Sequence, residues 1–252
     1  MIENKLEYKD NTTETLFFSV EDHKYYWNEE QIASVTTVLK NLTPATPLVL
    51  WSAKMSAEKF KTLVQAGQSY DEIKLLDYYN QIKNAHKESL DQSGVIGTFV
   101  HDAIENYVHS KQIPTFTNEQ MNKSFNKFKE WFDTQDELEI VFTERRLLSR
   151  IHKICGTVDA VFKNKKTGKH IVYDWKTSSG IRDSYYVQLY WYKMILCEMY
   201  DMEIDKAVIV NCTKDGKLKI AEFDIDSQCE DIAISSLKLY RFKPNQKKES
   251  KS

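Results

Sequence analysis

The second half of the chain alternates short apolar runs with polar turns, which is the pattern of β-strands. From residue 139 onward, the runs EIVFTERRLLS, KICGTVDAVFKN and KHIVYDWKTS predict three successive strands. The runs DKAVIVNCTK and KLKIAEFDI predict two more, joined at the turn signal Asp215-Gly216. Between these groups, SYYVQLYWYKMILCEMY predicts a helix over about 184–200, and a last helix is expected over about 227–242. This order predicts an α/β or α+β domain with a central mixed sheet flanked by helices.

The first half of the chain has mainly helical spacing. Residues 15–33 are the exception and predict a small β-hairpin, after which Ser34 is expected to cap a short helix. The segment 43–47 contains two prolines and is expected to break that helix, and a long helical region follows over about 48–92. Gly94 and Gly97 are expected to mark a loop before helices at 98–110 and about 117–133.

These patterns divide the chain into three segments. Residues 1–92 form an N-terminal hairpin and helical accessory region, and residues 93–243 form the core. Residues 244–252 form a polar, basic tail that is expected to be disordered.

Composition narrows the classes of function. The net charge is −2, so any DNA-binding charge has to be local, with Arg145 and Arg146 among the candidates. No apolar run is long enough to cross a membrane, and the N-terminus has no signal-peptide pattern, so we expect a cytoplasmic protein that does not contact a membrane. The four cysteines show no CxxC spacing, which predicts free thiols and neither a zinc site nor an iron–sulfur cluster.

Polar residues interrupt the strand pattern at the end of IVYDWKTS (171–178). A turn at Lys165–Gly168 would place Asp159 and Asp174 nearly opposite each other on adjacent strands. Asp174 and Lys176 are two residues apart and therefore share a face. The alternative without a catalytic role is an ordinary, partly exposed ion pair of Lys176 with one of the two acids.

Two opposed carboxylates repel each other unless a cation lies between them. Hard oxygen ligands favour Mg²⁺ or Mn²⁺, which would lower the pKa of a bound water and neutralise charge on a phosphate. An adjacent ammonium can orient that water or stabilise the phosphate oxygens. The cluster of Asp159, Asp174 and Lys176 is therefore suited to phosphodiester hydrolysis.

A sequence resemblance that covers about residues 20–200 also indicates phosphodiester hydrolysis. The series GTFVHDAIENYV (97–108), ERRLLSRIHKICGTVDAVF (144–162), IVYDWKTSS (171–179) and YYVQLYWY (185–192) resembles the RecB-like branch of the PD-(D/E)XK nuclease superfamily. The segments HKYYWNEEQIASVTTVL (23–39) and WSAK (51–54) are similar to phage-type exonucleases of that branch, which include relatives of the mitochondrial genome-maintenance exonuclease. The resemblance implies a restriction-endonuclease-like core.

The resemblance also implies roles for individual residues. Asp159 and Asp174 match the two acidic metal ligands, and Lys176 matches the motif lysine. The backbone carbonyl of Trp175 and the side chain of His101 would complete the coordination of one or two Mg²⁺ or Mn²⁺ ions. Val158 stands where the motif proline would be.

Further residues are assigned supporting roles. Gln188 and Tyr192 match the QxxxY motif, which contacts the DNA strand near the scissile phosphate. Thr177, Ser178 and Ser34 offer hydroxyl groups to phosphate, although strand termination and helix capping explain them equally well.

Two acids complete the set of candidates. Glu105 lies one helical turn from His101 and is expected to orient it, and Glu144 is expected to be an auxiliary acid. For Tyr185, Tyr186, Tyr190 and Trp191 we expect simple packing on the sheet.

These observations predict a Mg²⁺- or Mn²⁺-dependent DNA exonuclease. It would act on single-stranded DNA or DNA ends in replication, recombination or repair, in a bacterial or phage-infected cell. The alternatives are a structure-specific or restriction-type endonuclease and a catalytically silent nucleic-acid-binding subunit. A purely structural domain with a salt-bridged acidic pair is a weaker alternative.

Overall fold

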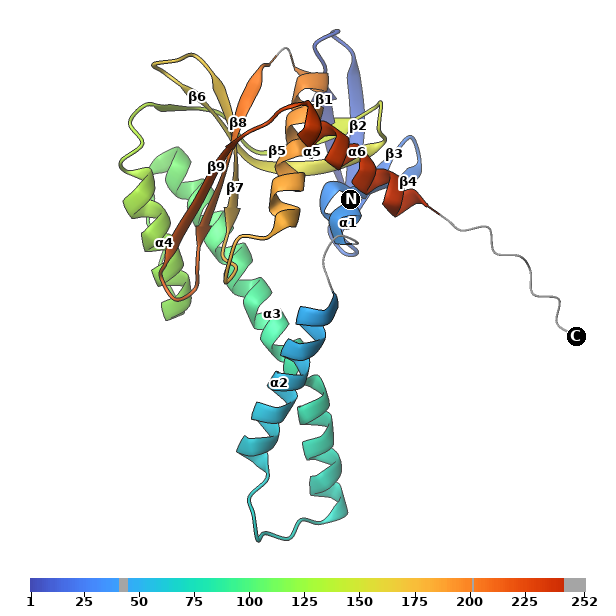
Figure 1. Ribbon diagram of the computed structural model, residues 1–252, viewed down its shortest axis with the longest axis vertical. Helices are drawn as coiled ribbons and strands as arrows, with labels where there is room; N and C mark the ends of the chain where they lie inside the picture. The colour runs from blue at the N-terminus through green and yellow to red at the C-terminus, as the bar shows by residue number, and fades with distance from the viewer. Residues whose placement is uncertain (41–44, 201, 243–252) are drawn as a thin grey trace, which may run out of the picture.

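A mixed β-sheet runs through the body of the protein, and a pair of long helices projects from it (Figure 1). The computed structural model describes residues 1–40, 45–200 and 202–242. Within these residues the strands are β1 (Ile2–Glu7), β2 (Thr13–Ser19), β3 (Lys24–Trp27), β4 (Glu30–Ser34), β5 (Leu138–Ser149), β6 (Ile154–Asn164), β7 (His170–Lys176), β8 (Ile204–Cys212) and β9 (Leu218–Asp224). The helices are α1 (Val35–Leu39), α2 (Ala45–Leu63), α3 (Glu72–Ser110), α4 (Glu119–Phe132), α5 (Asp183–Met199) and α6 (Ser227–Arg241).

The sheet is mixed, as predicted. Strand β6 lies at its centre, antiparallel to β5 and β7 and parallel to β4, and β8 pairs in parallel with β7. The strand order is β1-β2-β3-β4-β6-β7-β8-β9, with β5 paired to β6 off this path. The N-terminal hairpin therefore extends the central sheet through β4. Strand β1, which the sequence pattern did not predict, pairs with β2 and forms the edge of the sheet.

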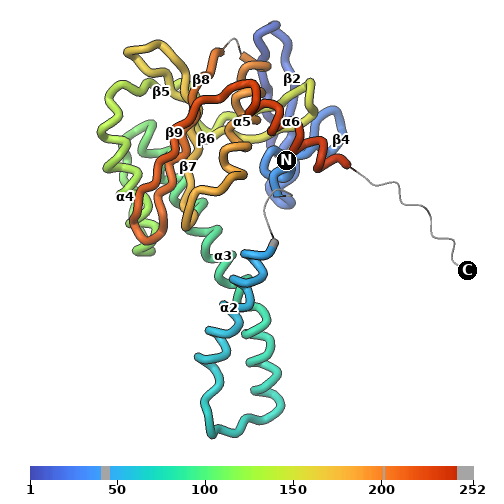
Figure 2. Tube along the Cα trace, viewed as in Figure 1, coloured from blue at the N-terminus to red at the C-terminus, as the bar shows by residue number. Residues whose placement is uncertain are grey.

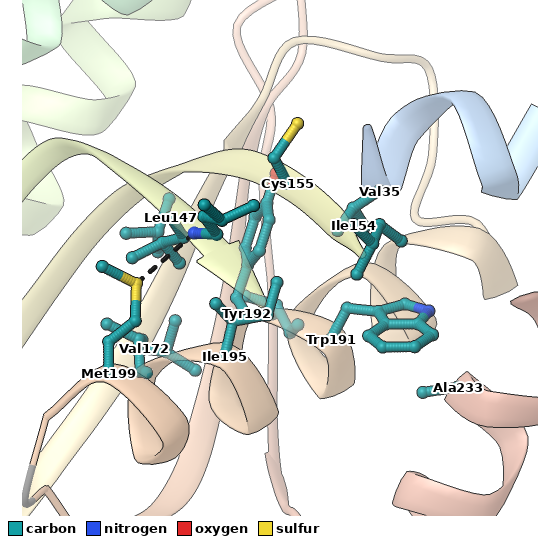
Figure 3. Packing of buried hydrophobic residues seen from close by; sticks show 14 of the residues in the cluster. Val35, Leu147, Ile154, Cys155, Val172, Trp191, Tyr192, Ile195, Met199 and Ala233 are labelled. Carbon is teal, nitrogen blue, oxygen red and sulfur yellow. Dashed lines mark hydrogen bonds between the residues drawn. The ribbon is translucent and has the colours of Figure 1, made fainter. Parts of the chain in front are cut away.

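Successive strand residues point to opposite sides of the sheet, so apolar side chains emerge on both faces. Helices cover each face and bury these side chains. Val172 of β7 faces α5 and joins a core with Trp191, Ile195 and Met199 (Figure 3). Its neighbour Tyr173 faces the other way, into a core formed with α3 and α4.

Helix α3 corrects the expected loop at Gly94 and Gly97. The helix runs without interruption from Glu72 to Ser110 and passes through both glycines. A helical glycine costs about 1 kcal/mol relative to alanine, which the burial of several apolar side chains in the C-terminal part of the helix outweighs. The buried residues are Ile96, Val100, Ala103, Ile104, Tyr107 and Val108.

The expected helical region over 48–92 is also divided differently. Helix α2 ends at Leu63, and α3 begins at Glu72 after Asp71, whose side chain caps it by accepting a hydrogen bond from the Lys74 backbone N–H at 2.8 Å. The predicted boundary between residues 92 and 93 therefore falls inside a continuous helix. Figure 2 shows that α2 and the first part of α3 form a hairpin extending away from the sheet.

Several smaller predictions are confirmed. Ser34 caps α1, because its Oγ accepts a hydrogen bond from the Thr37 backbone N–H at 3.1 Å. The four cysteines all lie in the described ranges and are free. No helix among the described residues has the length and apolarity needed to cross a membrane. Residues 43 and 44 of the predicted break at 43–47 lie outside the described residues, and the other three begin α2 at Ala45. The tail at 244–252 lies entirely outside the described residues.

Candidate active site

The hairpin of β6 and β7 brings the two predicted aspartates together. The last paired residues are Ala160 and Tyr173, so Asp159 and Asp174 occupy the next position on each strand. At that point the Trp175 backbone N–H donates a hydrogen bond to Asp159 Oδ2 at 2.7 Å. The predicted register is therefore confirmed, and the Asp159 side chain closes the end of the hairpin.

Lys176 shares a face with Asp174, as its spacing predicted. Its Nζ lies 2.6 Å from Asp174 Oδ1, and the Asp174 side chain is completely buried. The other oxygen, Asp174 Oδ2, is buried and has no hydrogen-bond partner among the described residues. A buried carboxylate oxygen without a partner is energetically costly, so this atom is a strong candidate for binding a further group.

His101 reaches the same point from helix α3. Its Nδ1 lies 3.9 Å from Asp159 Oδ2, and its ring interacts with the backbone of Trp175. The helix carries His101 there because the adjacent part of α3, including Val100 and Ala103, is buried against the sheet.

Glu144 of β5 completes the cluster, which gives it a more central position than an auxiliary acid. One ligand atom each from His101, Glu144 and Asp159 lie within 4.8 Å of one another. Glu144 has a φ of +43°, in the left-handed region that glycine favours. Glu144 stands opposite Asp159 in the β5–β6 register but is not paired with it, whereas Thr143–Ala160 and Arg145–Val158 are paired on either side. Strained residues of this kind cluster at functional sites.

A cavity of about 380 Å³ opens beside these side chains. It is lined by Gly97, Thr98, His101, Asp102, Glu105, Glu144 and Asp159. Glu105 therefore lies at the site as expected, but its predicted orienting contact with His101 stays a prediction. Asp102 was not singled out in the sequence, although its position next to a candidate histidine on a helix was the available signal.

The carboxyl groups have too little positive charge around them. Burial raises the pKa of Asp174 to about 6, although Lys176 opposes the shift, and burial also raises the pKa of Asp159. Glu144 keeps contact with solvent, yet burial of its carboxyl group and repulsion from Asp159 raise its pKa to about 8. All three shifts disfavour the anionic forms of the carboxyl groups. A bound cation would stabilise the anionic forms and so lower these pKa values.

The two nitrogen groups respond in opposite ways. Burial and the nearby Lys176 ammonium lower the pKa of His101, so its ring is neutral and able to act as a ligand. Burial opposes the charged form of Lys176, but Asp174 and Asp159 outweigh it and raise the pKa of the amine.

The donor set fits a hard divalent cation. Carboxylate oxygens with one imidazole are suitable ligands for Mg²⁺ or Mn²⁺, and the unpartnered Asp174 Oδ2 gives such an ion an otherwise unsatisfied atom to bind.

Gln188 and Tyr192 are buried on α5, and Tyr192 belongs to the core between α5 and the sheet. Gln188 Nε2 donates a hydrogen bond to the Tyr192 hydroxyl at 3.1 Å, and Tyr192 is only 2% exposed. Burial, followed by the charges of Asp159 and Asp174, raises the pKa of Tyr192. Direct contact of this pair with DNA stays a prediction, and the burial favours a role in supporting the strands.

The other candidate DNA ligands are partly engaged within the protein. Arg145 Nε donates a hydrogen bond to the Tyr200 hydroxyl at 2.9 Å, whereas the Arg146 guanidinium lies 4.5 Å from the Phe18 ring centroid. Arg146 Nη1 is buried with no hydrogen-bond partner in the described part of the chain. Ser178 Oγ donates a hydrogen bond to the Gly180 carbonyl at 2.7 Å.

Thr177 lies against helix α3. A Cβ built on Gly97 would be 3.5 Å from Thr177 Oγ1, so the end of β7 and the helix are close neighbours. DNA binding by Arg145, Arg146, Thr177, Ser178 and Ser34 remains a prediction.

Comparisons with known proteins give distant similarities among solved structures. No protein-family model matches the chain, and no curated protein matches it in sequence. Among solved structures, the crystal structure of SSO0001 is similar over 79% of this chain and 89% of that one, with 17% identity and a TM-score of 0.35.

Two solved structures carry exonuclease names. LHK-Exo in complex with dAMP is similar over 57% of this chain and 76% of its own, with 9% identity and a TM-score of 0.33. A candidate exonuclease from Eubacterium rectale is similar over 68% of this chain and 66% of its own, with 11% identity and a TM-score of 0.33. At these values, the function proposed below has to rest on the residues of this chain.

Proposed function

We propose that this protein is a Mg²⁺- or Mn²⁺-dependent DNA exonuclease that acts on single-stranded DNA or free DNA ends. The observation that carries the proposal is the convergence of Asp159, Asp174 and Lys176 at the end of one β-hairpin, with a buried Asp174 oxygen that has no partner among the described residues. The resemblance of the motif series to RecB-like nucleases supports DNA as the substrate and a role in replication, recombination or repair.

The residues of the cluster would divide two tasks, holding the cation and hydrogen-bonding the attacking water or the phosphate. His101, Glu144 and Asp159, whose ligand atoms lie within 4.8 Å of one another, would hold the cation. The unpartnered Asp174 Oδ2 and the Trp175 carbonyl would be further ligands. When bound, a divalent cation lowers the pKa of water and neutralises charge that develops on the phosphate. Lys176 would hydrogen-bond the attacking water or a phosphate oxygen, because its ammonium is kept charged beside Asp174.

The decisive experiment is digestion of end-labelled single-stranded DNA in Mg²⁺ or Mn²⁺, with chelator as a control. Asp174→Asn keeps the shape of the side chain and removes its charge, so we expect loss of cleavage with the fold retained. Asp205→Asn is the matched control, since Asp205 pairs with Lys169 on the surface at 2.6 Å, away from the cluster. Retained cleavage in Asp174→Asn and in Lys176→Met would contradict the proposal.

The choice of DNA distinguishes the remaining alternatives. An exonuclease leaves a covalently closed single-stranded circle intact, whereas an endonuclease opens it. Binding of DNA by the wild type without cleavage in either metal would instead indicate a silent binding subunit. Blocking each end of a linear strand separately would establish the direction of digestion.

A further inference from the structure

Tyr185 contacts the catalytic lysine, which simple packing on the sheet does not require. It lies in the first turn of α5, and its ring centroid is 5.0 Å from Lys176 Nζ. The side chain is half-buried against the core between α5 and the sheet. The ring and the Asp174 carboxylate are therefore both attractive neighbours of the ammonium.

The neighbouring tyrosines of α5 show what packing alone looks like. The rings of Tyr186 and Tyr190 lie 4.8 and 5.9 Å from the Phe223 ring centroid, and both residues are partly buried in the same core. Within the described part of the chain, neither of these rings makes a cation–π contact with Lys176, so Tyr185 differs from them in what it touches.

The contact becomes more important once a cation is bound. In the absence of metal, Asp174 Oδ1 holds the Lys176 ammonium at 2.6 Å. A divalent cation on the carboxylates withdraws part of that attraction and adds a like charge nearby, which pushes the ammonium away. The face of an aromatic ring attracts a cation through its quadrupole and does not compete for metal.

We propose that Tyr185 is a positioning residue that keeps the Lys176 ammonium in the active site when the carboxylates bind a divalent cation. This inference rests on the proposed function and deepens it, because it assigns the orientation of the catalytic lysine to the ring of Tyr185. The ring is required and the hydroxyl is not.

Three variants separate the ring from packing. Tyr185→Phe keeps the ring, Tyr185→Leu removes it, and Tyr186→Leu removes a neighbouring ring that packs on Phe223. With saturating Mg²⁺, we expect Tyr185→Leu to lower kcat by roughly 5- to 30-fold with KM for DNA unchanged, as for loss of a cation–π contact worth 1–2 kcal/mol. Tyr185→Phe and Tyr186→Leu should stay within about 2-fold of wild type.

A variant of almost identical shape covers the case in which Tyr185→Leu fails to fold. Tyr185→pentafluorophenylalanine keeps the size of the ring of Tyr185→Phe but reverses its quadrupole, so kcat should fall relative to Tyr185→Phe. Equal kcat in these two variants, or an equal loss in Tyr185→Phe and Tyr185→Leu, would overturn the inference.

A readout that needs no nuclease activity separates this inference from the proposed function. Acylation of lysines in Mn²⁺, followed by mass spectrometry of the peptide with Lys176, should proceed faster in Tyr185→Leu than in wild type or Tyr185→Phe. Equal labelling in all three would overturn the positioning role. A wild type that never cleaves DNA would instead refute the proposed function and leave the labelling result to decide the role of Tyr185.

Discussion

The two ends of helix α3 have different environments. Toward its C-terminus the helix is buried against the sheet and carries His101 into the candidate site. Toward its N-terminus it pairs with α2, and Ile73 and Leu76 are 83% and 61% exposed (Figure 2). Apolar residues occur at helical spacing at both ends of α3. Packing against the sheet therefore distinguishes the part that holds His101 from the part that projects.

The largest expected effect is a loss of stability when the buried isoleucine of this helix is truncated, compared with truncation of the exposed isoleucine at its other end. Ile104 is 2% exposed and Ile73 is 83% exposed, so they form a matched pair. Ile104→Ala should destabilise the protein by about 2–5 kcal/mol because it leaves a cavity in the core. Ile73→Ala should change stability by less than about 0.5 kcal/mol. Denaturant unfolding of both variants measures the difference, and similar losses would show that the projecting hairpin is buried against something in solution.

A substitution in the sheet tests how tightly the site is supported from below. A Cβ on Gly156 would lie 2.8 Å from Tyr192 Cε1, an unacceptably short contact with a buried ring. Gly156→Ala should therefore cost about 1–3 kcal/mol in the free energy of unfolding. It should also reduce DNA cleavage, because Tyr192 is close enough to Asp159 and Asp174 for their charges to raise its pKa. An unfolding transition equal to that of the wild type would mean that Tyr192 moves aside without cost.

The pH dependence of stability provides a test of charge at the site. The pKa values of Glu144 and Asp174 are raised to about 8 and about 6, so the folded chain holds protons that the unfolded chain has released. The lowered pKa of His101 acts in the opposite direction, but only below the ordinary histidine pKa of about 6.5. The stability of the metal-free protein should therefore fall as pH rises from about 7 to 8, and Mn²⁺ should restore more of it at pH 8 than at pH 5.

Thermal unfolding across this pH range, with and without metal, measures both effects. The double variant Glu144→Gln, Asp174→Asn should flatten the metal-free pH profile and abolish the effect of Mn²⁺. Asp205→Asn, which changes a surface carboxylate, should retain both. A Mn²⁺ effect in the double variant equal to that in the wild type would place the metal elsewhere.

The smallest expected effect lies in α3, at the glycine where the sequence pattern predicted a loop. Gly94 is helical, and an added Cβ would meet nothing within 4 Å. Gly94→Ala should therefore stabilise the protein by about 0.5–1 kcal/mol, since alanine loses less backbone entropy in a helix. A loss of stability in chemical denaturation would indicate that this part of the helix has to bend.

The sequence pattern predicted the strands after residue 138 better than the region before them. Strand periodicity and the turn at Gly168 are local signals, so β5 to β9 and α5 follow from them. The loop expected at Gly94 and Gly97 was wrong because glycine is only a weak helix breaker, and the burial of residues such as Val100 and Ile104 outweighed it. Strand β1 was missed because the run Ile2–Glu7 is mostly polar and buries only part of one face.

The sequence by itself determined that Asp159, Asp174 and Lys176 meet, because a tight turn sets the register of two adjacent strands and the two-residue period sets their faces. Only the tertiary structure decided that His101, Glu144 and Tyr185 surround them. These three come from a helix before the hairpin, the strand leading into it and a helix after it, and no local spacing specifies how such distant elements pack. That arrangement depends on the burial of apolar surface on both faces of the sheet, which is a property of the whole chain.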